Sequence, residues 1–216
     1  MKRILLALVA LLVACACAQP VPSLKLIGSY VLPNDTVFEG TRVGGISGLS
    51  YDASTGLAWL LSDDKSEFAP ARVYTAKLVF DQDSFDAVEL RSVVTLLQPN
   101  GSPFPEGRLD PEGLRASGGR LYLSSEGQND DEAVIAPMLW EAAFDGSFVQ
   151  DFDLPAVYLP QAGQDVGVRD NLAFESVALS PDAPQLFVAN ENSLLQDGPI
   201  SNLTETGVVR ITRFDL

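Results

Sequence analysis

The sequence predicts an all-β, propeller-like fold with about three four-stranded blades. Short apolar runs alternate with turn-forming residues, including 17 Gly and 14 Pro in 216 positions, which favours strands and turns over long helices. A strand-turn-strand motif recurs about every 64 residues. The chain is 46% apolar and 20% charged, a balance typical of one folded domain.

Each copy of the repeat begins with two predicted strands and a tight turn. The first strands start at Ile46, Pro111 and Phe174, and the second strands start at Leu57, Leu121 and Leu186. Gly, Asp, Ser and Pro fill the intervening turns, at 52–56, 117–120 and 180–185. Apolar residues alternate along several of these segments, as expected for strands that bury one face.

A second pair of strands follows in the first two copies, at 72–80 with 87–97 and at 138–144 with 148–159. The third copy adds one strand, at 208–216, and residues 24–33 resemble the missing fourth one. We expect these residues to complete the third blade, because exchange of a terminal strand hides sheet edges. Three blades lie below the usual range of about four to eight, so we expect a propeller truncated at its C-terminal end; the alternative is a different all-β fold such as a sandwich.

Residues 1–18 have the pattern of a signal peptide, with Lys2 and Arg3 before an apolar run over 4–14. That run is too short for a permanent membrane span. Residues 12–15 also resemble a lipobox, in which the leader ends at 14 and a lipid is attached to Cys15. We therefore expect an exported domain over 19–216 that is periplasmic, secreted, or a surface or outer-membrane lipoprotein held by Cys15 alone.

Composition leaves carboxylates as the main available chemistry. The chain has no histidine, which excludes Ser-His-Asp and Cys-His catalysis and zinc sites built on imidazole. Both cysteines, Cys15 and Cys17, lie in the leader, so the folded domain has no disulfide. A net charge of −15 opposes nucleic-acid binding and attracts divalent cations.

Acidic residues recur at equivalent places in the repeats. Glu112 and Glu175 stand near the start of the first strands, where the first copy has Ser47. Inner strands of successive blades line one channel, so we expect these side chains to converge there and to bind Ca²⁺, with Asn and Asp on the surrounding loops adding oxygen ligands. The alternative is that the acids cap strand ends and turns. The expected metal ligands are Asp63, Asp64, Glu126 and Glu191, and the loop residues are Asn129, Asp130, Asp131, Asn190 and Asn192.

Several motifs together resemble the phytase-like family, the exported group labelled "esterase-like activity of phytase". They are Gly44-Gly45-Ile46-Ser47-Gly48, Leu61-Ser62-Asp63-Asp64, Asp110-Pro111-Glu112-Gly113-Leu114, Ser124-Ser125-Glu126-Gly127, Phe174-Glu175-Ser176 and Asn190-Glu191-Asn192. The resemblance covers about 24–216 and departs at Ser176, where the family tends to have Gly. It implies a β-propeller with further blades after this segment, and a phosphoester or ester hydrolase activity carried by Asp and Glu.

On this basis the sequence predicts a Ca²⁺-dependent hydrolase of small phosphorylated or ester substrates. Glu112 and Glu175 are the expected catalytic residues, because either can orient or deprotonate an attacking water. Arg72 and Lys65 are expected to bind the substrate's phosphate; the alternative for Arg72 is an ion pair with Asp63 or Asp64. Two other functions remain open, namely a surface-tethered, non-catalytic binding propeller with a structural ion, and an inactive truncated fragment.

Overall fold

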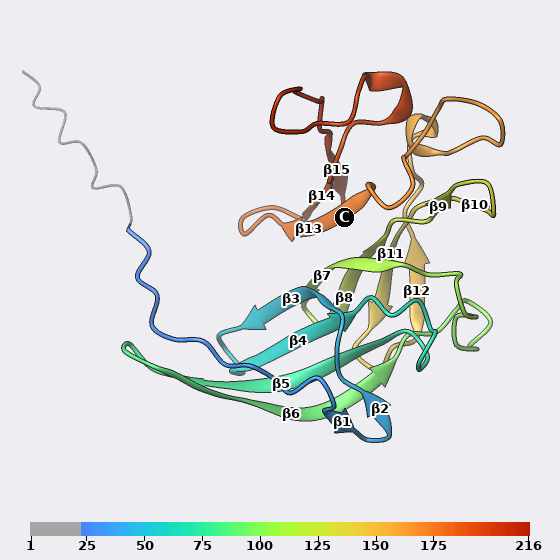
Figure 1. The fold of residues 1–216 in the computed structure, drawn as a ribbon. Coiled ribbons are helices and arrows are strands. Elements are labelled where there is room, and N and C mark those ends of the chain that lie inside the picture. The colour runs from blue at the N-terminus through green and yellow to red at the C-terminus, as the bar shows by residue number, and fades with distance from the viewer. Residues whose placement is uncertain (1–22) are drawn as a thin grey trace, which may run out of the picture.

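The structure, a computed structural model, describes residues 23–216 and contains three antiparallel sheets arranged like successive propeller blades (Figure 1). The predicted all-β, propeller-like class is confirmed. The first sheet contains β3 (Ile46–Asp52), β4 (Leu57–Ser62), β5 (Arg72–Phe80) and β6 (Phe85–Thr95). The second contains β7 (Pro111–Ser117), β8 (Arg120–Ser125), β11 (Met138–Ala143) and β12 (Phe148–Asp151), and the third contains β13 (Phe174–Leu179), β14 (Gln185–Asn190) and β15 (Ile211–Asp215).

Two small hairpins and two short helices complete the described elements. One hairpin joins β1 (Val37–Phe38) to β2 (Thr41–Arg42), and the other joins β9 (Gln128–Asn129) to β10 (Val134–Ile135). The 3₁₀ helices are η1 (Ala156–Tyr158) and η2 (Leu195–Asp197). Within residues 23–216, no helix has the length and apolar character required to cross a membrane.

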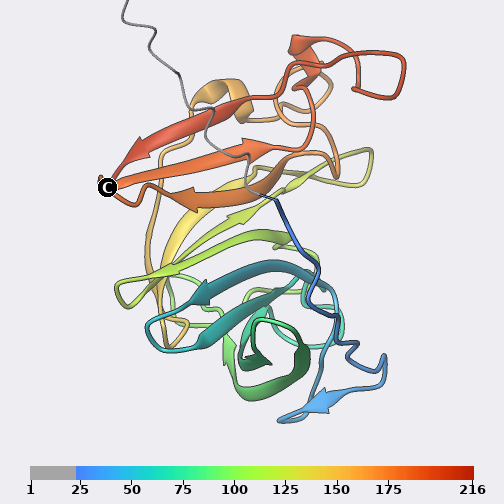
Figure 2. The same cartoon turned by 90° about the vertical axis from the view of Figure 1, so that its left-hand side faces the viewer.

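The first strand of each sheet lies at the inner edge of its blade. Strand β7 contacts both β3 and β13, so the three inner strands follow one another through the molecule (Figure 2). Close packing requires small residues between them. A Cβ at Gly48 of β3 would lie 2.9 Å from the Cβ of Leu114, and one at Gly113 of β7 would lie 2.7 Å from Cγ2 of Val177. Ser176 of β13 stands at the equivalent position in the third blade and is exposed.

Alternation along the strands builds one core on each side of the second blade. In β4, Trp59 and Leu61 face the second blade, and they pack in one cluster with Leu121 and Trp140 of that blade. The opposite face of the second blade contributes Leu139 to a second cluster, which contains Phe174 and Leu186 of the third blade and Tyr158 of η1. Alternate residues of a strand point to opposite faces of its sheet, so the second blade packs against the first blade on one face and the third blade on the other.

The N-terminal segment does not complete the third blade as expected. Residues 23–33 form no strand, and they lie beside the first blade, where Lys25 pairs with Asp83 at 2.9 Å and the ring of Tyr30 lies 6.4 Å from that of Phe85. Leu32 packs with Phe38 over a third cluster on the outer face of this blade. Packing against exposed apolar surface thus outweighs pairing with β15 in the described chain. The predicted leader, with Cys15, lies outside the described residues.

The segment predicted as a strand over 148–159 is also shorter than expected. Strand β12 ends at Asp151, and Pro155 precedes the turn of η1. Proline has no backbone donor and a fixed φ, so residues near Pro155 do not continue the strand toward 159. Tyr158, although apolar in pattern, packs in the second core cluster instead of in the sheet.

Candidate functional site

Each inner strand contains a β-bulge at the repeat-equivalent position. The pairing with the second strand shifts between Ile46 and Gly48, between Pro111 and Leu114, and between Phe174 and Ser176. The residue that a bulge adds is free of the normal ladder and its side chain is redirected. In the second and third blades this feature carries Glu112 and Glu175. In the first blade it carries Ser47, whose Oγ donates to the carbonyl oxygen of Pro111, 3.0 Å away.

The second set of acids follows directly after the second strands. The backbone N–H groups of Asp63, Glu126 and Glu191 donate to the carbonyl oxygens of Gly45, Asp110 and Ala173, at 2.8, 3.0 and 2.7 Å. Each acceptor immediately precedes an inner strand. The same bond therefore fixes the backbone of each acid next to the bulge of its own blade.

Asp110 is a member of the site that sequence reasoning missed. It is 5% exposed and lies just before β7, while the equivalent positions in the other two repeats hold Gly45 and Ala173. The search for recurring acids could not find a residue that is acidic in one repeat only. Its place inside the quoted Asp110-Pro111-Glu112 motif was the available signal.

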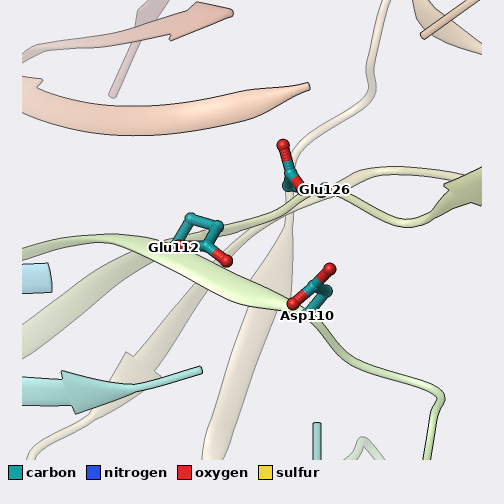
Figure 3. A group of neighbouring side chains, drawn as sticks. All are labelled: Asp110, Glu112 and Glu126. Atoms are coloured by element: carbon teal, nitrogen blue, oxygen red, sulfur yellow. The ribbon is translucent and has the colours of Figure 1, made fainter. Parts of the chain in front are cut away.

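Five carboxylates converge where the inner strands begin. Oxygens of Asp110, Glu112 and Glu126 lie within 4.8 Å of one another, and so do those of Glu126, Glu175 and Glu191. Figure 3 shows the first group, with Glu112 on β7, Asp110 just before this strand and Glu126 after β8. Glu126 belongs to both groups and stands at the centre of the site. The predicted convergence of Glu112, Glu126, Glu175 and Glu191 is therefore present.

Burial and mutual repulsion raise the pKa values of Glu112 and Glu126 most. Burial raises the pKa of Glu112 to about 8, and the charges of Glu175, Asp110, Asp63 and Glu126 act in the same direction. Burial also raises the pKa of Glu126 to about 7, against the hydrogen bond that the Ala173 N–H donates to its Oε1 at 2.6 Å. Two acids thus change charge near neutral pH, a property typical of functional sites.

The neighbouring acids are shifted in the same direction. Burial and then the charge of Asp110 raise the pKa of Asp63, which extends the acidic group toward the first blade. Burial and then the charge of Glu191 raise the pKa of Glu175. The pKa of Asp110 is raised by burial, despite the opposing hydrogen bond and charge of Lys65.

Lys65 is the cation that contacts this group. Its Nζ lies 2.6 Å from Oδ2 of Asp110, and its side chain is half exposed. Burial opposes its charged form, but the hydrogen bond and charge of Asp110 raise the pKa of Lys65 above its ordinary value. Lys65 therefore stays protonated and neutralises part of the acidic charge.

Arg72 and Asp64 bind one another instead of joining the carboxylates. Nη1 of Arg72 lies 2.5 Å from Oδ2 of Asp64; the side chain of Arg72 is buried and that of Asp64 is 10% exposed. Nε of Arg72 donates to the hydroxyl of Tyr74 at 2.6 Å, and Nη2 donates to the carbonyl oxygen of Arg42 at 2.7 Å. This geometry favours a structural ion pair over phosphate binding by Arg72. Because Asp64 is paired with Arg72, its carboxylate is not free to bind a metal ion as expected.

Three of the expected loop residues bond to the backbone around them, whereas Asn190, the last residue of β14, is buried and its side-chain amide has no hydrogen-bond partner among residues 23–216. Oδ1 of Asn192 accepts from the N–H groups of Ser193 and Ser201, and Nδ2 of Asn129 donates to the carbonyl oxygen of Val168. Asp130 accepts from the turn that follows it. Turn stabilisation, the alternative weighed for these residues, explains Asn129, Asp130 and Asn192.

Comparison with known proteins places the chain in a family. The phytase-like family, described as "Esterase-like activity of phytase", matches residues 41–216. No curated protein matches the chain. Among solved structures, the periplasmic gluconolactonase PpgL of Pseudomonas aeruginosa is similar at 14% identity and a TM-score of 0.43, over 69% of this chain and only 38% of that protein. The match of the family over most of the sequence shows that this chain belongs to the phytase-like family.

Proposed function

We propose that this protein is an exported hydrolase of phosphoesters or esters that works with a bound divalent cation. The observation that carries the proposal is the convergence of five carboxylates at the inner ends of the second and third blades, two of them with pKa values near neutral pH. The family, named for an esterase-like activity, supports the same class of reaction. The N-terminal leader pattern supports export.

The donor set fits a hard cation, and Ca²⁺ suits it best. The site offers only carboxylate oxygens, which Ca²⁺ binds in groups of six to eight ligands with flexible geometry. Glu126, Glu175 and Glu191 would hold the ion as one group, and Asp110 and Glu112 lie with Glu126 in the other group. The ion would neutralise the repulsion among these carboxylates, of which Asp110 and Glu126 are buried. A bound ion would act as a Lewis acid on a phosphoryl or carbonyl oxygen.

Glu112 has the properties of a general base. Its pKa of about 8 means that Glu112 is mostly protonated at neutral pH while no ion is bound. A bound cation would lower this pKa and leave a carboxylate that can accept a proton. The bulge of β7 presents its carboxyl among the other acids, where it can accept the proton of an attacking water. Glu175, from the bulge of β13, would orient the same water from the adjacent blade.

Lys65 would serve the substrate as well as the site. Its Nζ holds Asp110 by a charge-assisted hydrogen bond, which fixes that carboxyl beside Glu112. Because half of the side chain is exposed, its remaining N–H groups are accessible to an incoming oxyanion. Because the protein has a net charge of −15, it repels an anionic substrate. Lys65 and a bound metal ion would offset this repulsion at the site.

The proposal is tested by hydrolysis of a panel of nitrophenyl phosphates and carboxylic esters by the purified chain, with Ca²⁺ and with a chelator. We expect turnover only with the ion, and a loss of about 10²–10⁴-fold in kcat for Glu112→Gln. Glu205→Gln, an exposed residue in the loop after η2, is the matched control and keeps full activity. Ca²⁺ binding without turnover of any ester would instead identify a binding propeller with a structural ion.

A further inference from the structure

A cavity of about 560 Å³ next to the carboxylates is lined by residues of both charges. Its acidic lining residues are Asp63, Asp64, Glu67, Asp110 and Glu112. Arg42 and Phe68 also line it, together with Gly44 and Gly45, which contribute no side chains. A cavity of this size is typical of a small-molecule site.

Arg42 differs from the other two basic residues of the cavity. Lys65 pairs with Asp110 and Arg72 pairs with Asp64, but the guanidinium of Arg42 forms no ion pair with any residue over 23–216. Its side chain is exposed and lies over the ring of Phe68, with Cζ 5.6 Å from the ring centroid. The cavity therefore contains one cation that has no carboxylate within ion-pair distance among residues 23–216, although Glu67 also lines the cavity.

The backbone of Arg42 is held in place by buried residues. Its carbonyl oxygen accepts hydrogen bonds from Nη2 of Arg72 at 2.7 Å and from the hydroxyl of Tyr74 at 2.8 Å. Strand β2 also pairs with β1, where Arg42 lies opposite Val37. The ion pair of Arg72 with Asp64 thus serves to position Arg42, because the same guanidinium contacts both residues. A fixed backbone and an exposed, unpaired guanidinium are what a preformed anion site requires.

We propose that Arg42 binds an oxyanion, a phosphate or carboxylate group, of the ligand that occupies this cavity. A guanidinium offers a planar pair of N–H donors that matches both oxyanions. Gly44 and Gly45 line the same cavity, and their N–H groups donate to no backbone acceptor among the described residues. If the ligand of this cavity is the substrate, the anion site at Arg42 rests on the proposed function. The substrate then has a second anionic group in addition to the ester attacked at the carboxylates.

The test measures binding of inorganic phosphate and of acetate to the purified chain by calorimetry, with a chelator present so that no metal contributes. We expect Arg42→Gln to weaken phosphate binding by at least about tenfold and Arg42→Lys to weaken it less, because an ammonium keeps the charge but loses the planar donor pair. Arg91→Gln removes the same charge from the exposed pair with Glu89 on β6, and we expect it to leave binding unchanged.

The proposal would be overturned if Arg42→Gln bound phosphate and acetate as tightly as the natural chain does. It would also be overturned if the natural chain bound neither anion. Tighter binding of phosphate than of acetate indicates a phosphorylated ligand, and the reverse order indicates a carboxylate. Because this measurement needs no turnover, Arg42-dependent binding without ester hydrolysis would retain the anion site and remove the proposed enzyme. Hydrolysis of anionic esters with a KM insensitive to Arg42→Gln would retain the enzyme and remove the site.

Discussion

Two acidic residues near the ends of second strands, Asp64 in the first blade and Glu126 in the second, have little solvent exposure but opposite surroundings. Asp64, after β4, is neutralised by Arg72 at 2.5 Å. Glu126, after β8, is 2% exposed and has one N–H donor, that of Ala173, while the nearest charged groups are other carboxylates. A buried charge with its complement is complete within the chain, whereas buried like charges without one indicate that a proton or a cation completes the site.

Removal of Arg72, the partner of Asp64, has the largest expected effect on stability. Arg72→Met leaves Asp64 charged and mostly buried and takes donors from Tyr74 and Arg42, so we expect a loss of about 3–5 kcal/mol in the free energy of unfolding. Urea unfolding measures this loss. The double variant Arg72→Met/Asp64→Leu should recover most of it, and Arg91→Gln, in an exposed pair, should cost about 0–1 kcal/mol. A loss below about 1 kcal/mol for Arg72→Met would show that the pair of Arg72 with Asp64 stabilises the protein no more than an exposed ion pair does.

The carboxylates around Glu126 are expected to make the protein less stable as the pH rises. The raised pKa values of Glu112 and Glu126 mean that the folded state keeps protons that the unfolded chain releases above the ordinary carboxyl pKa of 4.5. Without Ca²⁺, the free energy of unfolding should therefore fall by about 1–3 kcal/mol as the pH rises from that value to about 8. Unfolding curves across this pH range measure the slope.

Glu126→Gln should flatten this pH dependence, because the amide cannot ionise, and Glu205→Gln should leave it unchanged. Addition of Ca²⁺ near pH 8 should restore stability by about 2.7 kcal/mol at a hundredfold excess over its Kd. Stability that does not change with pH in the absence of the ion would show that the carboxylates have ordinary pKa values, and stability that rises with pH would show that folding lowers their pKa values.

A smaller effect is expected where glycine makes room for an acid of the site. Gly45 has φ +56°, and a Cβ there would lie 1.9 Å from Oδ1 of Asp63. Gly45→Ala should cost about 1–2 kcal/mol more than Gly56→Ala, because Gly56 has φ +70° but nothing within 4 Å of the added atom. The pair separates backbone strain from displacement of Asp63. Equal losses, measured by urea unfolding, would show that Asp63 moves without cost.

The smallest effect is expected at the bulge of the first blade. Ser47→Ala removes the hydrogen bond to Pro111 and should cost about 1 kcal/mol, the usual value of such a bond. The increase in Tm on addition of Ca²⁺ should not change, because Ser47 adds no carboxylate to either group. A reduced Ca²⁺ response of Ser47→Ala in a thermal melt would place the first blade within the ion site.

Much of the fold and of the site could be predicted because both depend on a repeat. The period-two burial pattern located the strands from Ile46 to Asn190, and the recurrence of acids located Glu112, Glu126, Glu175 and Glu191. Asp110 broke the recurrence and escaped detection. Arg42 also escaped, since nothing in its local sequence separates an exposed strand residue from a residue of a cavity.

The sequence by itself determined the order of strands, the turns between them and the acidic positions of each blade, because apolar alternation and turn chemistry are local properties of the chain. The tertiary structure alone decided which charges meet. Stacking of β7 between β3 and β13 brings carboxylates from two blades together, while the fold of the first blade gives Asp64 to Arg72. Burial and neighbouring charge set the pKa values of these groups, and both arise only when distant segments pack.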